Sequence, residues 1–170
     1  MRIKIEDIKE GHNPVRFPAK DIIGEKIHGY KIVDSDDLDL DAEKSGLYIH
    51  IAGSNTVEFE ALCDRCAENY KTRQFIKIDY MFHIGKLSKT NVDILEIDPS
   101  ENGGYLYIDN CFAEAFFISQ PMKHLCSDNC RGLCQKCGKN LNNGSCSCKS
   151  ERSIDPRWNK LQNILDKKNS

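Results

Sequence analysis

The sequence predicts an α+β protein in which an antiparallel β-sheet or partly closed barrel carries one buried helix, followed by a smaller cysteine-rich module. Three observations support this class. Apolar and polar residues alternate in several stretches before residue 110, as they do in strands with one buried face. Residues 110–119 are apolar nearly all round, as in a helix packed on a sheet. Six of the nine cysteines lie between Cys126 and Cys148.

The first predicted elements come from short alternating segments. Residues 1–6 alternate apolar and charged side chains and predict a strand. Residues 26–33 predict a second strand, interrupted by Gly29. Residues 34–43 contain six acids and predict a solvated loop, because they lack the glycine and glutamate spacing of a calcium-binding EF-hand loop.

Two alternating segments, residues 47–51 and 57–61, predict a hairpin joined by the loop Gly53-Ser54-Asn55. The second of these strands continues into Cys63-Asp64-Arg65-Cys66, and residues 70–83 form the next strand. The C-x-x-C motif is therefore predicted to lie at a turn between two strands, where a metal ion would hold both strand ends.

The remaining elements are two strands and two helices. Residues 92–97 and 105–108 predict strands, and Asp109 is expected to cap the buried helix that follows. Cys111 in that helix is interpreted as a small core hydrophobe. Residues 155–166 predict an amphipathic helix that carries Trp158 and covers the metal module or the sheet.

Length and composition limit the size and the compartment. With 170 residues and 39% hydrophobic residues, the chain is expected to form one β-rich domain, residues 1–120, and one cysteine-rich module with a C-terminal helix, residues 121–170. The sequence shows neither a signal-peptide pattern nor an apolar stretch of about 18 residues. We therefore expect a cytoplasmic protein with no membrane partner and no small-molecule substrate.

The cysteine spacing predicts bound metal, because two close cysteine pairs can supply the four thiolates of a tetrahedral Zn²⁺ site. The pairs Cys134/Cys137 and Cys146/Cys148 form one such tetrad, as in a zinc ribbon. The other two pairs form a second tetrad. Nine cysteines thus divide into four, four and one, which favours two structural zinc ions. The second tetrad comprises Cys63, Cys66, Cys126 and Cys130.

Alternatives remain open at this point. A rival pairing puts Cys126, Cys130, Cys134 and Cys137 in one site and the other four cysteines in the second, and His124 could replace a sulfur in either. Iron–sulfur ligation uses the same donors. Disulfides are disfavoured by the odd cysteine count and by the lack of a secretory signal.

Residues 63–66 have the pattern C-x-R-C, and residues 130–142 have the pattern C-x-G-L-C-x-x-C-G-x-N-L-N. Together these motifs resemble those of the YceD-like large ribosomal RNA subunit accumulation proteins. The tail Asp155-Pro156-Arg157 is similar to the closing D-P-R helix. The resemblance runs from about residue 22 to residue 165 and implies a role in large-subunit rRNA accumulation and ribosome biogenesis.

The charge distribution suggests which part would contact a partner. Residues 1–120 carry 14 basic and 22 acidic residues, or −8, whereas residues 121–170 carry 10 and 4, or +6, giving the net −2. The basic part is expected to contact either a large-subunit rRNA precursor or a ribosomal or assembly protein. The candidate contact residues are Arg131, Lys136, Lys139, Lys149 and Arg157.

No catalytic constellation stands out in the sequence, and we expect a protein that is not an enzyme. Two other classes compete with the assembly factor. One is a zinc-ribbon nucleic-acid-binding protein that acts in transcription. The other is a C-x-x-C thiol-redox protein, which is disfavoured because Cys63 and Cys66 lie between two strands and do not open a helix.

Overall fold

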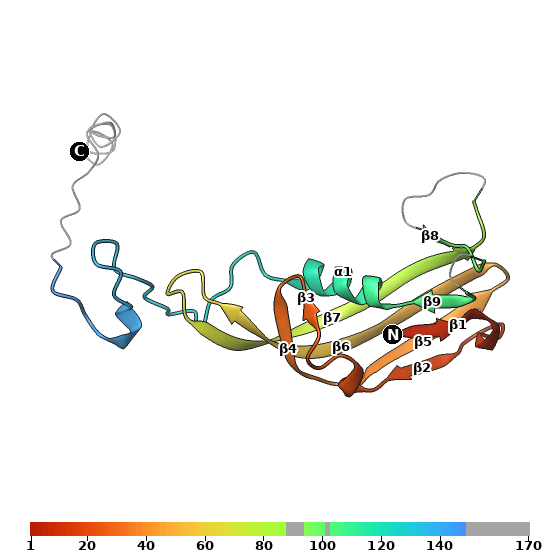
Figure 1. Cartoon of the computed structure of the whole chain (residues 1–170), viewed down its shortest axis with the longest axis horizontal. Helices are drawn as coiled ribbons and strands as arrows, with labels where there is room; N and C mark the ends of the chain where they lie inside the picture. Colours follow the sequence, from red (N-terminus) through yellow and green to blue (C-terminus); the bar gives the residue numbers. More distant parts are fainter. Residues whose placement is uncertain (88–93, 101–102, 149–170) are drawn as a thin grey trace, which may run out of the picture.

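The computed structural model describes residues 1–87, 94–100 and 103–148. Figure 1 shows an elongated molecule in which a twisted sheet with one helix across it occupies one end and the cysteine-rich segment the other. The long strands β6 and β7 reach from the sheet toward that segment. The helix predicted at residues 155–166, and with it Lys149 and Arg157, lies outside the described residues.

The main sheet is built on two long antiparallel strands, β6 (Tyr48–Leu62) and β7 (Asn69–Ile84), which pair along their whole length. The other edge of β6 is shared by two different partners along its length. Near its start β6 pairs with β5 (Leu38–Ser45), which in turn pairs with β2 (Pro14–Phe17). Farther along, β6 pairs with β4 (Tyr30–Ser35), and β4 pairs with β3 (Lys26–Ile27).

Two smaller pairings complete the described strands. The short strand β8 (Ile94–Ile97) runs parallel to the end of β7, and β1 (Arg2–Lys4) pairs with β9 (Tyr105–Tyr107) in a separate ribbon. The described sheet is therefore mostly antiparallel, with one parallel edge strand, and it does not close into a barrel. The predicted fold class, a sheet with one helix and a cysteine-rich module, is confirmed.

The acidic segment 34–43, predicted as a solvated loop, is mostly strand, and this expectation was wrong: residues 34–35 end β4 and residues 38–43 lie in β5. Leu38, Leu40 and Ala42 in β5 are buried, while the acids between them face outward. The alternation of apolar and acidic residues is thus the period of a strand with one solvated face. Ser45 pairs with Tyr48, so the turn from β5 to β6 includes Gly46. Gly46 has a φ of 61°, a backbone conformation that glycine adopts without a steric penalty.

The hairpin predicted around Gly53 was also wrong, because β6 runs straight through this position. A Cβ atom at Gly53 would lie 2.3 Å from the Asp39 carbonyl oxygen in β5. Gly53 therefore permits the close approach of the neighbouring strand, which is a known role of glycine inside a strand. Asn55 is 3% exposed, and its side-chain amide donates to the Asp36 carbonyl at 2.8 Å.

The helix α1 (Asp109–Ser119) packs one face on the sheet and connects it to the cysteine-rich segment. Phe116 is fully buried and makes edge contacts with Phe59 and Tyr30, with ring centroids 5.1 and 5.9 Å apart. The opposite face is open, since Phe117 is 59% exposed and Ile118 72%. The buried positions of the helix are Cys111, Phe112, Ala115 and Phe116.

Two details of the helix environment complete the fold. Asp109 does not cap the helix with its side chain as expected, and its carboxylate instead pairs with the amino group of Met1. No helix among the described residues is long and apolar enough to cross a membrane.

Candidate metal centre

The Cys63-x-x-Cys66 motif forms the turn between β6 and β7, as the sequence predicted. The turn is closed by the Ala67 N–H, which donates to the Cys63 carbonyl at 2.8 Å, and by the Cys63 N–H, which donates to the Glu68 carbonyl at 2.9 Å. We call residues 63–68 the hairpin tip. Cys63 and Cys66 are only 1% and 2% exposed, so both thiols face inward, whereas the other four residues of the hairpin tip are exposed.

The segment after α1 is bound to the hairpin tip by backbone hydrogen bonds. The Asp64 N–H donates to the His124 carbonyl at 2.8 Å, and the His124 N–H donates back to the Asp64 carboxylate at 2.7 Å. Farther along, the Leu133 N–H donates to the Arg65 carbonyl at 3.0 Å. These bonds align residues 124–133 with the tip and bring Cys126 and Cys130 to its two cysteines.

Glycine is required where this segment crosses the tip most closely. Gly132 has a φ of 72°, and a Cβ atom there would lie 2.9 Å from the Arg65 carbonyl oxygen. The Arg65 side chain secures the same crossing, because its guanidinium donates to the carbonyls of Asp128 and Cys130 at 3.3 and 3.2 Å. The tip and residues 124–133, which we call the tail segment, therefore form one small unit, the proximal unit.

Four sulfurs converge in this unit, and we call them the proximal cluster: Cys63, Cys66, Cys126 and Cys130. All four lie within 4.8 Å of one another. The Sγ atoms of Cys63 and Cys130 are 3.8 Å apart and those of Cys66 and Cys126 3.7 Å apart. A tetrahedral Zn²⁺ site with Zn–S bonds of about 2.3 Å has sulfurs about 3.8 Å apart, whereas a disulfide needs about 2.05 Å. The geometry fits a single ion.

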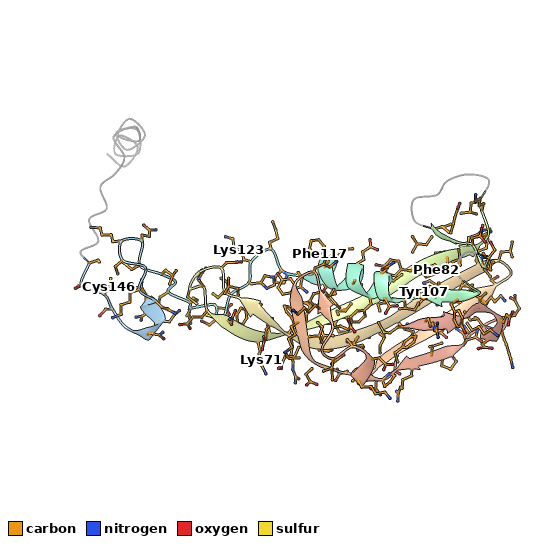
Figure 2. All side chains as sticks on the ribbon, in the orientation of Figure 1. Lys71, Phe82, Tyr107, Phe117, Lys123 and Cys146 are labelled. Atoms are coloured by element: carbon orange, nitrogen blue, oxygen red, sulfur yellow. The ribbon has the colours of Figure 1, made fainter. Side chains whose placement is uncertain are left out.

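A second group, the distal cluster, lies nearer the end of the described chain: Cys134, Cys137, Cys146 and Cys148. Its sulfurs also lie within 4.8 Å of one another. The Gly138 N–H donates to the Cys134 carbonyl at 2.9 Å and closes a second C-x-x-C turn, in which Gly138 has a φ of 72°. Figure 2 shows Cys146 at the end of the molecule remote from Phe82 and Tyr107.

Each cluster contains at least one thiol whose pKa lies below its ordinary value. Burial raises the pKa of Cys63, but backbone N–H groups, led by that of Cys126, outweigh it and lower the pKa to about 6. The Cys126 N–H lies 3.4 Å from the Cys63 sulfur. In the distal cluster, the backbone N–H groups of Cys137 and Lys136 lower the pKa of Cys134 to about 6. Amides directed at sulfur stabilise thiolates, the form that binds metal.

Each cluster also contains a thiol that resists ionisation. A hydrogen bond to the Cys130 sulfur, followed by burial, raises the pKa of Cys126 to about 12. A hydrogen bond to the Cys137 sulfur and then burial raise the pKa of Cys148 to about 12. Four adjacent thiols cannot all carry a negative charge unless a cation lies between them. A divalent ion would remove this repulsion, and the donor set fits one.

The structure brings the eight cysteines together in the grouping that the sequence favoured, and not in the rival one. His124 lies in neither group. Its Nε2 atom is 3.1 Å from the Tyr30 hydroxyl, and its ring packs against Tyr30 and Phe59. His124 therefore joins the tail segment to the sheet core. Cys111 is buried in that core, and burial raises its pKa to about 11.

The predicted contact residues that are described belong to the cysteine-rich segment. Arg131, Lys136 and Lys139 are all exposed, and the Lys139 ammonium donates to the Ser145 carbonyl at 2.9 Å. Two supporting side chains were not among the predicted site residues: Arg65 donates to backbone carbonyls beside the cluster, and Asn142 donates to one of its sulfurs. The Asn142 amide donates to the Cys130 sulfur at 3.3 Å. Only its place at the end of the C-x-x-C-G-x-N-L-N motif marked it in the sequence.

Comparison with known proteins gives one match. A family model described as "Large ribosomal RNA subunit accumulation protein YceD" matches residues 51–165, which is more than half of the 170 residues. The match includes both cysteine clusters and all of β6 and β7 beyond residue 50. Neither the curated proteins nor the solved structures give a match. The chain belongs to the YceD family, and the resemblance found in its motifs is confirmed.

Proposed function

We propose that this member of the YceD family is a non-catalytic zinc protein of the cytoplasm that supports accumulation of large-subunit rRNA during ribosome assembly. The observation that carries the proposal is the proximal cluster, which takes two sulfurs from the hairpin tip and two from the tail segment. An ion there would hold the cysteine-rich segment against the β6–β7 hairpin. A second ion in the distal cluster would shape the end of that segment.

Zinc fits these sites better than an iron–sulfur cluster does. All four sulfurs of each group lie within 4.8 Å of one another, so they converge on one ion. In a cluster of two or four irons the cysteines bind different metal atoms, which sets their sulfurs farther apart. Zinc prefers four tetrahedral sulfur ligands in structural sites, and such a site has no open position for water or substrate. The donor set therefore supports a structural role.

The partner is expected to meet the cysteine-rich segment and not the sheet. Residues 1–120 carry a net charge of −8, which would repel RNA phosphates, whereas residues 121–170 carry +6. Two tetrathiolate zinc sites reduce this excess to about +3, because half of the proximal ligands lie outside the segment. Contacts from Arg131 and Lys136 to phosphate would make the association strongly dependent on salt.

Co-sedimentation with large-subunit precursors at low salt tests this function. The double variant Arg131→Glu/Lys136→Glu should lose most of the association, and the matched control Lys20→Glu/Lys26→Glu, with the same charge change on the sheet region, should keep it. Both variants should retain two metal ions. Association that survives removal of RNA by nuclease would indicate a ribosomal or assembly protein as the direct partner. A wild-type chain that never sediments with the precursors would contradict the proposal.

A further inference from the structure

The loop that separates the two cysteine pairs of the distal cluster folds back onto the proximal cluster. Residues 138–145 connect Cys137 to Cys146 and include the short helix η3 (Leu141–Asn143). The Leu141 N–H donates to the Gly132 carbonyl at 2.9 Å, beside the hairpin tip. The loop is therefore held at its two ends by Cys137 and Cys146 of the distal cluster, and in its middle by the hydrogen bond to Gly132.

Asn142 makes the direct contact with a proximal ligand. Its side-chain nitrogen donates to the Cys130 sulfur at 3.3 Å, and its side-chain oxygen accepts the Arg131 N–H at 2.8 Å. The Arg131 N–H can only donate, so the amide oxygen must face it and the NH₂ group must face the sulfur. Asn140 helps to position Asn142, because its side-chain oxygen accepts a hydrogen bond from the backbone N–H of Asn142 at 2.9 Å.

A hydrogen bond of this kind stabilises the charged form of the sulfur. Four thiolates around one divalent ion carry a formal charge of −2, and an N–H donor directed at one sulfur spreads that charge. Outer partners that orient or neutralise metal ligands typically change metal affinity by about 10- to 100-fold when removed. Here the donor comes from a loop whose ends belong to the other site.

We propose that Asn142 couples the two metal sites, so that an ion in the distal cluster raises the metal affinity of the proximal cluster. Distal binding fixes Cys137 and Cys146, which holds the loop in the conformation that presents the Asn142 amide to Cys130. By thermodynamic linkage, proximal binding strengthens distal binding by the same factor. Asn142 is a positioning residue, and this inference rests on the two metal ions of the proposed function.

The test is a double-mutant cycle on the full chain with cadmium as the probe metal. Asn142→Asp keeps the acceptor for the Arg131 N–H, removes the donor to sulfur and adds one negative charge. Asn129→Asp is the matched control, because it adds the same charge next to Cys130 at an exposed position, whereas the asparagine that donates to the sulfur is Asn142. Cys137→Ser/Cys148→Ser removes the distal site. Cadmium-113 NMR under chelator competition follows each site by its own resonance.

The coupling predicts that Asn142→Asp and loss of the distal site each lower proximal affinity about 10- to 100-fold, and that the combined variant falls no further than either one. Asn129→Asp should match the wild type. The proposal is overturned if proximal affinity is unchanged without the distal site, or if the two losses multiply. A wild-type chain without any bound cadmium would instead overturn the metal sites of the proposed function themselves.

Discussion

Gly132→Ala offers a quantitative test of how the tail segment is docked on the hairpin tip. Gly132 adopts a φ of 72°, and its missing side chain leaves room for the Arg65 carbonyl oxygen, which a Cβ atom would approach to 2.9 Å. Gly138 adopts the same φ of 72° in the distal turn, but nothing lies within 4 Å of its Cβ position. The two glycines thus share the same φ, and of the two only Gly132 has a close neighbour at its Cβ position.

The expected magnitudes follow from this comparison. A residue other than glycine in the left-handed region costs about 1–2 kcal/mol, and both alanine variants incur this cost. At Gly132 the Arg65 carbonyl must also move away, which breaks its hydrogen bond with the Leu133 N–H, now 3.0 Å long. Such a bond contributes about 1 kcal/mol. At 1.4 kcal/mol per factor of ten, Gly132→Ala should weaken proximal metal binding about 30- to 140-fold.

Competition with a coloured chelator measures these effects as metal dissociation constants. Gly138→Ala should weaken only distal binding, by about 10-fold, and leave proximal binding within a few-fold of wild type, since the strain is confined to the distal turn. If Gly132→Ala bound metal as tightly as the wild type, or weakened it no more than Gly138→Ala did, the tail segment would not rest on the hairpin tip as described.

Three further substitutions separate the parts of the molecule. Cys137→Ser should release one of two metal ions and leave the sheet folded by circular dichroism; loss of the whole fold would place the module boundary elsewhere. Phe116→Ala removes a fully buried ring in contact with Phe59. It should lower the free energy of unfolding, measured in urea, by about 3–5 kcal/mol, while both metal ions stay bound. Loss of metal before the sheet unfolds would contradict the expectation that the metal clusters do not depend on this part of the core. Hydrogen bonds from His50 and then Lys77 lower the pKa of Asp79 from 3.8 to about 2, so its contribution is present above about pH 4 and is lost as the pH falls toward 2. Asp79→Asn should therefore be less stable than wild type at neutral pH and equal to it near pH 2, and a constant difference would contradict the assignment.

The parts of the fold that the sequence predicted are those with one strong local signal. The strand before Cys63 and the strand after Cys66 were predicted from the alternation of apolar and polar residues on both sides of a tight turn. The helix after Asp109 follows from its dense apolar composition, although its exposed Phe117 shows that composition does not say which face is covered. Pair spacing and counting predicted two groups of four cysteines, but only the structure shows which pairs lie together.

The errors arose where one residue type has two physical meanings. Gly53 signalled a turn, but in the folded chain it makes room for the Asp39 carbonyl of the neighbouring strand. The acids near Asp39 signalled a loop, but Leu38 and Leu40 between them are buried. Both facts depend on β5 lying beside β6, which is a pairing between distant parts of the chain that local patterns do not contain.

The outer contacts of the metal clusters also depend on tertiary placement. Arg65 donates to the carbonyl of Cys130, which is distant in the sequence. Asn142 donates to the sulfur of Cys130 from a loop that folds back onto the proximal cluster. His124 was a ligand candidate because histidine binds zinc, yet its ring packs on Tyr30 in the sheet core. Residue type alone therefore identified the donors and not the groups that support them.

The most direct test is to identify the metal in the purified full chain by elemental analysis and to count the bound ions by native mass spectrometry. The free thiols are then counted after denaturation. We expect two zinc ions in each chain and nine free thiols, eight of which become reactive only when a chelator removes the metal. A folded chain that contains no metal, or whose clustered cysteines are joined as disulfides, would contradict it.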